Sequence, residues 1–198
     1  MDAQVYMRTN STGVRIEMAD GTTLTYDGEN VFMSPENSEY GLKKARFDIF
    51  TWTYFFAFPY KVKDPGTFWE LTGEKVLDES NKKYETAKLT FGENIGDAPD
   101  DWYWVYKDKE TNRIKAAAYI VTFSSSAEKA NENPHAISYD KYELVNGIPV
   151  STEWGFWDWN EETGISNKRG FGTLSGFEFV KEEATWFQKG ENAVNVPR

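Results

Sequence analysis

The chain has 198 residues, a formal net charge of −10 and no cysteine, and 17% of its residues are aromatic. The acidic balance argues against a nucleic-acid partner or an anionic membrane surface, because both require a surface dense in lysine and arginine, and the missing cysteine excludes disulfides, thiolate metal sites and cysteine nucleophiles. The length suits one domain, so we expect a single domain over residues 1–198, with an ordered core at about 14–187 and a polar C-terminal tail.

The first third of the sequence predicts a meander of three short strands. Residues 14–18 alternate apolar and polar side chains, as a half-buried strand does. Two Asp-Gly pairs, which favour tight hairpin turns, separate this segment from further strand-like segments at 22–26 and 30–33.

Residues 38–58 predict a helix that is apolar on nearly all sides. Ser38 can cap its start, and Pro59 is expected to end it. The helical spacing is carried by aromatic side chains, namely Phe47, Phe50, Tyr54, Phe55 and Phe58. We expect this helix to be buried or to face a hydrophobic cavity. A strand is the alternative interpretation, because aromatic residues and threonine also favour strands.

From residue 68 onward the sequence reads as antiparallel strands joined by turns. A polar loop is expected at 124–133, and the tail from Lys189 is expected to fray. The predicted strands are 68–77, 83–91, 102–107, 113–123, 137–145, 148–159 and 171–180. This pattern predicts a mainly β fold in the form of a sandwich, a barrel or a half-barrel, and the long strands favour a curved antiparallel sheet.

Two of these strands carry an unusual number of large rings. On the segment 102–106 both faces are bulky and apolar, which indicates a strand covered on both sides. Its expected hairpin partner carries three alanines at 116–118, and the segment 154–159 repeats the aromatic pattern. Small residues opposite large rings either complete the packing or leave space for a ligand.

No catalytic constellation is visible. His135 is the single histidine, and it is expected in a polar loop beside Pro134. The serine-hydrolase elbow, the phosphate-binding loop and the dinucleotide fingerprint are all missing from the sequence. The acidic loop 93–101 contains Asp97, Asp100 and Asp101, but their spacing does not match an EF-hand. We therefore expect no catalytic residue, no metal and no cofactor.

Several phrases, in this order along the chain, resemble an uncharacterised family of secreted or lipid-anchored proteins of Bacteroidota-type bacteria. They are Tyr54-Phe55-Phe56-Ala57-Phe58-Pro59, Asp64-Pro65-Gly66, Thr90-Phe91-Gly92, Gly96-Asp97-Ala98-Pro99-Asp100-Asp101 and Tyr106-Lys107-Asp108-Lys109-Glu110-Thr111. The pattern is in turn similar to the LolA/LolB-like and LppX-like lipoprotein carriers. The resemblance implies a half-barrel wrapped around one or two helices, a hydrophobic cavity, and a periplasmic or outer-membrane-associated address. This sequence departs from the pattern because it lacks an export signal, a lipid-bearing cysteine and an N-terminal helix.

The leading hypothesis is therefore a non-enzymatic binding or carrier protein for a hydrophobic or lipid-like ligand in the cell envelope, with the apolar helix covering the concave face of the sheet. The expected lining residues are Phe50, Tyr54, Phe55, Phe58, Trp102, Trp104, Tyr119, Trp154 and Phe156. One alternative is a carbohydrate-binding or protein-interaction module with tryptophans exposed in a flat row. Another is an enzyme acting on glycans or esters, which needs two converging carboxylates or a serine beside His135.

Overall fold

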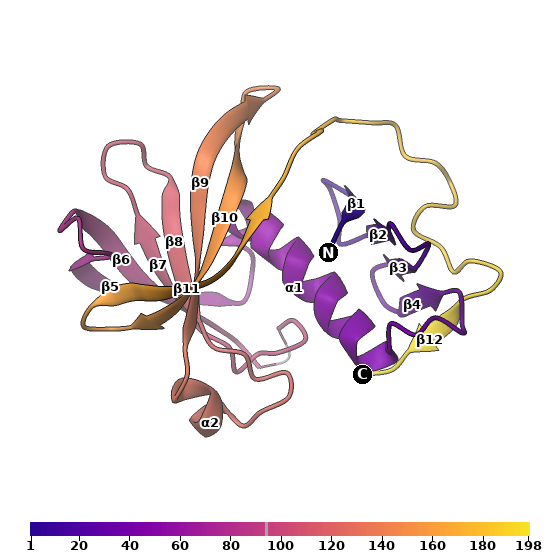
Figure 1. The fold of residues 1–198 in the computed structure, drawn as a ribbon, viewed down its shortest axis with the longest axis horizontal. Coiled ribbons are helices and arrows are strands. Elements are labelled where there is room, and N and C mark those ends of the chain that lie inside the picture. Colours follow the sequence, from indigo (N-terminus) through magenta and orange to yellow (C-terminus); the bar gives the residue numbers. More distant parts are fainter. Residues whose placement is uncertain (94) are drawn as a thin grey trace. The chain divides into compact units, whose positions relative to one another are not determined.

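The computed structural model describes residues 1–93 and 95–198, which form two compact units, each built on one antiparallel sheet. The smaller unit comprises Met1–Phe58 and Phe179–Arg198, and the larger unit comprises Pro59–Glu178. Two helices are present in the described part of the chain (Figure 1). The expected mainly β, antiparallel fold class is confirmed, and the expectation of a single domain stays a prediction.

The sheet of the smaller unit is the predicted meander with one strand added at each edge. Its order is β1 (Ala3–Met7), β2 (Val14–Met18), β3 (Thr23–Tyr26), β4 (Val31–Ser34) and β12 (Val194–Val196). Gly21 and Gly28 supply the positive φ angles, 87° and 110°, that the two tight turns require. The prediction of a frayed tail is wrong, because β12 pairs with β4 through Val196 opposite Val31.

Helix α1 (Leu42–Lys61) differs from the prediction at both ends. Ser38 does not cap it: its hydroxyl accepts a bond from the backbone N–H of Tyr40 in a turn before the helix. Gly41 then turns the chain with a φ of 85°, and the helix begins at Leu42. Pro59 lies inside the last turn and does not end the element. Pro59 removes one helical hydrogen bond, and only two residues of the helix follow it.

The first half of α1 supplies the core of the smaller unit. Ala45 and Ile49 are fully buried against the apolar side of the sheet, where they meet Ile16, Leu24 and Met33. Each of these large side chains stabilises the fold by about 1.5–3 kcal/mol relative to an exposed position.

The larger unit is an up-and-down meander in which every strand pairs with its neighbours in sequence. Its strands are β5 (Thr67–Val76), β6 (Lys83–Phe91), β7 (Tyr103–Lys107), β8 (Ile114–Tyr119), β9 (His135–Val145), β10 (Ile148–Asn160) and β11 (Gly164–Thr173). The prediction for the last strand, 171–180, is wrong because β11 begins directly after a tight turn that the Asn160 side chain closes. The loop expected at 124–133 contains the short helix α2 (Ala127–Asn131), which Ser126 caps.

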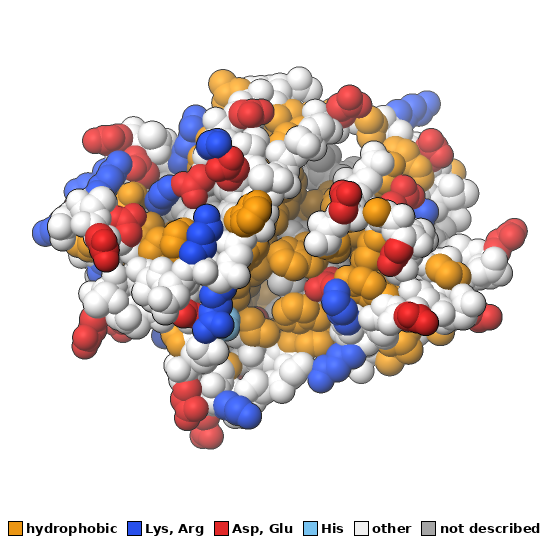
Figure 2. Space-filling view, viewed as in Figure 1, with side chains coloured by type: hydrophobic (Ala, Val, Ile, Leu, Met, Phe, Trp, Pro, Cys, Tyr) orange, Lys and Arg blue, Asp and Glu red, His pale blue; other side chains and the backbone are white. Residues whose placement is uncertain are grey.

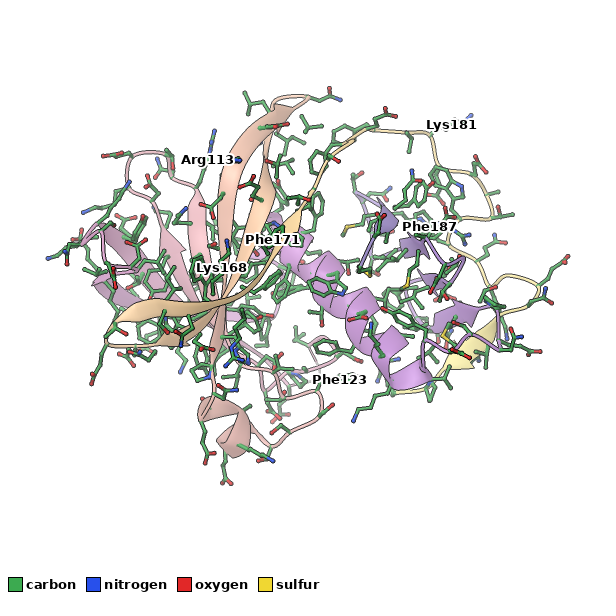
Figure 3. The ribbon with its side chains drawn as sticks, in the orientation of Figure 1. Arg113, Phe123, Lys168, Phe171, Lys181 and Phe187 are labelled. Atoms are coloured by element: carbon green, nitrogen blue, oxygen red, sulfur yellow. The ribbon has the colours of Figure 1, made fainter. Side chains whose placement is uncertain are left out.

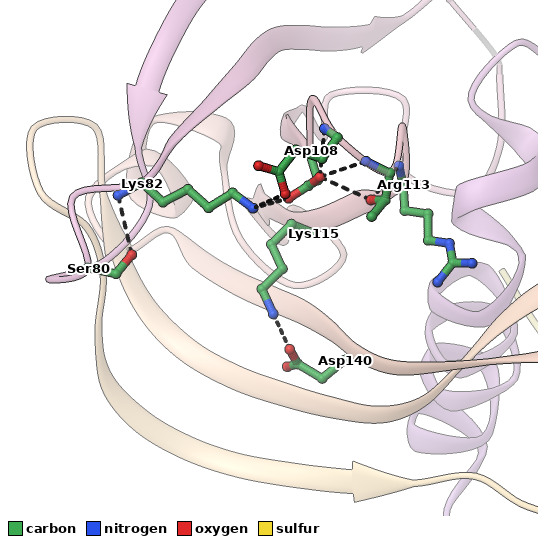
Figure 4. A network of polar contacts seen from close by, with 8 residues as sticks. Ser80, Lys82, Asp108, Arg113, Lys115 and Asp140 are labelled. Carbon is green, nitrogen blue, oxygen red and sulfur yellow. Dashed lines mark hydrogen bonds and ion pairs between the residues drawn. The ribbon is translucent and has the colours of Figure 1, made fainter.

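The two edge strands of this sheet meet at one corner. The backbone N–H of Ile165 in β11 donates to the carbonyl of Leu77, just beyond β5, at 2.8 Å. A Cβ atom on Gly164 would lie 2.1 Å from that carbonyl oxygen, so this approach requires glycine. Lys75 and Glu161 add an ion pair at 2.9 Å nearby. Because the first and last strands are in contact, the sheet curves, as the curved strands in Figure 4 show.

Candidate functional site: the two faces of the large sheet

Strand register sorts the side chains of the larger sheet onto two faces. Residues directly opposite in an antiparallel pair share a face, and alternate residues along a strand point to opposite faces. Trp104 pairs with Ala118, whereas Tyr103 pairs with Tyr119. The tryptophan face is the side that carries Trp104, Tyr106, Ala116, Ala118, Ala136, Trp157 and Trp159. The tyrosine face is the side that carries Tyr103, Val105, Ala117, Tyr119, Ile137, Tyr139, Trp154 and Phe156.

Rings fill the space on the tryptophan face. Ala116 and Ala118 are fully buried in one cluster with Trp104, Tyr106 and Trp159. The Trp159 indole N–H donates to the Tyr106 hydroxyl at 2.9 Å, and burial raises the pKa of Tyr106 to about 12. The alanines opposite the large rings therefore complete the packing here.

The tryptophan face ends in charged groups at both edges of the sheet. Lys88 lies with its ammonium group 5.2 Å from the centre of the Trp102 ring. On β11, Lys168 lies 5.3 Å from the Trp157 ring and 5.9 Å from the Phe171 ring; Figure 3 labels both Lys168 and Phe171. Such contacts hold cations over aromatic faces. An apolar ligand would therefore have to pass lysines to enter this side.

A polar network closes one end of the tryptophan face (Figure 4). The Asp108 carboxylate accepts hydrogen bonds from the Lys82 ammonium at 2.6 Å and from the backbone N–H of Thr111 at 2.9 Å. These bonds, led by that to Lys82, hold the pKa of Asp108 well below its ordinary value. Lys115 pairs with Asp140 beside it. The network fixes the turn between β7 and β8.

The tyrosine face carries an apolar row that crosses the whole sheet. Consecutive register pairs link one residue from each strand, in the order Leu71, Ala87, Val105, Ala117, Ile137, Phe156 and Gly170. None of the seven is polar or charged, and Ala117 and Ile137 in the middle are fully buried. Seven strands at about 4.8 Å spacing make the row roughly 29 Å long. At the β5 end, Leu71 is 87% exposed.

Aromatic side chains flank this row on the same face. Tyr103 and Tyr119 lie with ring centres 6.0 Å apart, and Tyr139 meets Trp154 edge-on at 6.3 Å. Burial raises the pKa of Tyr119 well above its ordinary value, so its hydroxyl stays protonated and uncharged. These rings therefore add apolar area beside the row. The flank through Tyr119 ends at β10 in Asp158, which pairs with His135 across the strands and forms an ion pair with Arg169.

The tyrosine face is open where it reaches the edge strand β11. Gly170 pairs with Phe156, and Gly172 pairs with Trp154. A Cβ atom on either glycine would meet only those rings within the described residues, at 3.8 Å or more, and neither glycine has a positive φ. Gly170 adjoins the irregularity in pairing between Phe156 and Trp157, whereas no such irregularity is present at Gly172. A strand glycine marks either a bulge of this kind or a place where a ligand or another backbone comes close.

His135 lies on the tyrosine face and not in a loop. It is the first residue of β9, and its ring centre is 6.2 Å from that of Tyr119. Its Nδ1 atom is buried and has no hydrogen-bond partner within the described chain, and burial lowers its pKa. Ser138, three residues on, points to the opposite face, where its hydroxyl donates to Asp140 at 3.1 Å. The described residues therefore show no serine–histidine pair on β9.

The acidic loop contributes a carboxylate that fixes the neighbouring chain. Asp101 accepts hydrogen bonds from both the backbone N–H and the hydroxyl of Thr122, each at 2.8 Å. Burial raises the pKa of Asp101, and these two bonds oppose that shift. Apart from residue 94, which lies in this loop outside the described residues, no group of three or more acidic or histidine side chains is placed to hold a metal.

The predicted lining residues do not share one face. Tyr119, Trp154 and Phe156 lie on the tyrosine face, whereas Trp102 and Trp104 belong to the tryptophan cluster. The remaining four are on α1 in the smaller unit: Phe50, Tyr54, Phe55 and Phe58. Of these, Phe50 packs edge-on against Tyr26 at 5.0 Å, and Tyr54 packs against Phe58 at 5.7 Å. The sequence analysis did not name Val105, Ala117 and Ile137 as lining residues. Their positions in the alternating pattern of strongly apolar strands could have indicated that role.

Comparisons with known proteins confirm the resemblance. The model of a family of unknown function, DUF6503, matches residues 5–164. No curated protein matches the chain. A crystal structure of a LolA superfamily protein from Nitrosomonas europaea is similar, with a TM-score of 0.53 and 14% identity over 94% of this chain and 80% of that chain. That likeness shows a shared fold. Within the described residues, no helix is both long and apolar enough to cross a membrane.

Proposed function

We propose that this protein, which belongs to the DUF6503 family of unknown function, is a carrier that binds a hydrophobic or lipid-like ligand on the tyrosine face of its larger sheet. The observation that carries the proposal is the uncharged row from Leu71 to Gly170. Binding would be driven by burial of apolar surface, at about 25 cal/mol per Å2 removed from water.

The contrast between the two faces supports this choice. The corresponding row on the tryptophan face begins with Glu70 and Lys88 and ends with Lys168. A charged side chain that a ligand covers loses hydration, and this loss opposes binding. The tyrosine face has no such group along its row, and Gly170 and Gly172 leave room beside its rings.

The fold likeness to a LolA superfamily protein also supports a carrier. A periplasmic or outer-membrane-associated address is part of the same proposal and rests on that likeness. Figure 2 shows acidic and basic side chains interspersed over the visible face, which suits a protein that stays in solution while it carries an apolar guest.

The carbohydrate-binding alternative needs tryptophans exposed in a flat row. Among the eight tryptophans only Trp69 is exposed, at 41%, and its indole N–H donates to the carbonyl of Val62. One exposed ring does not make a stacking platform for a glycan.

Two substitutions on β5 test the proposal as a matched pair. Leu71 and Phe68 are both exposed, at 87% and 60%, but they point to the tyrosine and the tryptophan face, respectively. Leu71→Glu should weaken binding of the apolar dye N-phenyl-1-naphthylamine about tenfold or more, because covering a leucine gains about 1.5–3 kcal/mol. Phe68→Glu, with the same change in charge, should alter it less than twofold. Equal effects of the two variants, or no dye binding by the parent protein, would contradict the proposal.

Native mass spectrometry of protein purified from an exporting host provides the second measurement. The parent protein should retain a mass excess that corresponds to lipid, and Leu71→Glu should reduce its occupancy. Because both variants change surface residues, their unfolding free energies should stay within about 0.5 kcal/mol of the parent.

A further inference from the structure

We propose that the smaller unit carries a second binding site, independent of the carrier function, that takes a small oxyanion of the phosphate or sulfate type. The site is a hollow between the outer face of the small sheet and the C-terminal strap, which we define as Phe179–Arg198. Its lining residues are Arg15, Thr23, Thr25, Phe32, Ser34, Gly190 and Ala193.

The strap is firmly attached on both sides of the hollow. On one side, Arg8 donates to Glu182 at 2.9 Å and its guanidinium lies 4.5 Å from the ring of Phe187, which Figure 3 labels. Trp186 packs against Tyr6 with ring centres 4.5 Å apart. On the other side, β12 pairs with β4. The turn between these attachments is therefore held over the sheet, and the hollow beneath it is a defined space.

The size of the hollow suits a compact ion. Its volume is about 70 Å3. Since a single water molecule needs at least about 10–15 Å3, the hollow has room for roughly five water-sized atoms. A tetrahedral oxyanion has that number of non-hydrogen atoms and therefore fits the hollow.

Hydroxyl groups in the hollow lack partners. Thr25 is only 4% exposed, and its hydroxyl makes no hydrogen bond to any described residue. The hydroxyls of Thr23 and Ser34, which face each other across β3 and β4, are also without a partner in the described chain. These hydroxyls border the hollow and can donate to a ligand there, and each such bond would strengthen binding.

The donor groups around the hollow favour an acceptor ligand. Arg15 donates from Nε to Glu17 at 2.7 Å, and its two terminal nitrogens make no hydrogen bond within the described residues. Lys189 lies 5.7 Å from the ring of the lining residue Phe32. Glu17 pairs with Thr23 across β2 and β3 and offsets part of the charge on Arg15, and Lys189 donates to Asn195 at 3.0 Å. Guanidinium and hydroxyl donors together match an oxyanion.

A bound oxyanion would connect three strands of the sheet to the strap. Arg15 lies on β2, Thr23 and Thr25 on β3, and Ser34 on β4, whereas Gly190 belongs to the strap. Because such a ligand binds only the folded arrangement, it stabilises the attachment of the strap by an amount that grows with the logarithm of its concentration.

Isothermal titration calorimetry and thermal unfolding with sodium phosphate and sodium sulfate test the site, with sodium chloride at equal ionic strength as the reference. Arg15→Gln should weaken phosphate binding at least tenfold, and Thr25→Val about fivefold, which corresponds to one neutral hydrogen bond. Lys43→Gln removes the same charge from an exposed position on α1 and should change binding less than twofold. Ser34→Ala, at a half-exposed position, replaces Thr25→Val if that variant does not fold.

A second arm distinguishes a free anion from a lipid headgroup. Binding of inorganic phosphate that is lost in Arg15→Gln assigns a free oxyanion. If the parent protein cosediments with vesicles of dioleoylphosphatidic acid but does not bind inorganic phosphate, and Arg15→Gln abolishes the cosedimentation, the ligand is a headgroup phosphate. The proposal is overturned if neither source binds, or if Arg15→Gln and Ser34→Ala bind as tightly as the parent. Neither result depends on dye binding at the tyrosine face.

Discussion

Gly170→Leu separates open space from filled space on the tyrosine face. A Cβ atom at this position would have the Phe156 ring as its nearest neighbour, at 3.9 Å, and no positive φ strains the substitution. Glycine in a strand costs about 0.5–1 kcal/mol relative to alanine, and the added side chain can pack on Phe156. We therefore expect the unfolding free energy to stay equal or to rise by about 0.5–1 kcal/mol, as measured by urea denaturation followed by tryptophan fluorescence.

The same leucine would occupy area that the ligand needs. Covering one leucine-sized surface contributes about 1.5–3 kcal/mol, so Gly170→Leu should weaken dye binding about ten- to a hundredfold. Thr173→Leu, on the same strand but on the exposed opposite face, is the matched control and should leave binding unchanged. A loss of stability above about 1 kcal/mol would show that the space is filled. Unchanged binding in a stable Gly170→Leu protein would refute the placement of the ligand.

Three further predictions concern stability. Asp108→Ala should lower the unfolding free energy by about 2–3 kcal/mol at pH 7, because Lys82 and the backbone N–H groups of the turn lose a charged acceptor. Since the pKa of Asp108 is depressed, the stabilisation by its carboxylate should diminish as the pH falls through the acid range. Urea titrations of both proteins at pH 7 and pH 3 would show this. Because the pKa of His135 is lowered in the folded protein, the unfolded chain takes up a proton near pH 6.5 more readily than the folded chain does. The melting temperature should therefore decrease as the pH is lowered from about 6.5, and His135→Phe should reduce this dependence of the melting temperature on pH. Tyr106→Phe should cost about 1–3 kcal/mol in urea denaturation because it leaves the buried Trp159 N–H without an acceptor, and a loss below about 0.5 kcal/mol would show that water replaces the hydroxyl.

The features that the sequence predicted well are those set by local chemistry. The hairpin at 137–159 follows from alternating strands around Asn146-Gly147, and the turn has the positive φ angles, 50° and 82°, that this pair tolerates. The three-stranded meander follows in the same way from its Asp-Gly turns.

The features that it missed depend on distant partners. β12 has only three residues and is a strand because β4, far away in the sequence, offers a free edge. β11 contains Gly170 and Gly172, which lower its strand propensity, so its start was placed too late. The helix start was placed too early because Ser38 has the chemistry of a cap but bonds to a turn.

The candidate site was predictable in composition but not in arrangement. Alternation shows that Trp102 shares a side with Trp104, and that Trp154 shares a side with Phe156. Alternation cannot show whether the two pairs lie on the same face of the sheet. Their relative position depends on the register of the strands from β7 to β10. Only the paired ladder reveals that the sheet separates them.

The aromatic excess therefore serves two purposes, and the difference bears on affinity. On the tryptophan face the rings cover one another and the alanines beneath them, so that side needs no further partner. On the tyrosine face the middle of the apolar row is buried while both ends stay accessible, at Leu71 and beside Gly170. A ligand that spreads along the row must replace whatever already covers its middle, so only the net gain in buried area contributes to binding. The net gain in buried area is largest at the open ends of the row, which predicts moderate affinity and ready release of the ligand. Substitutions at Leu71 and Gly170 should therefore affect binding most.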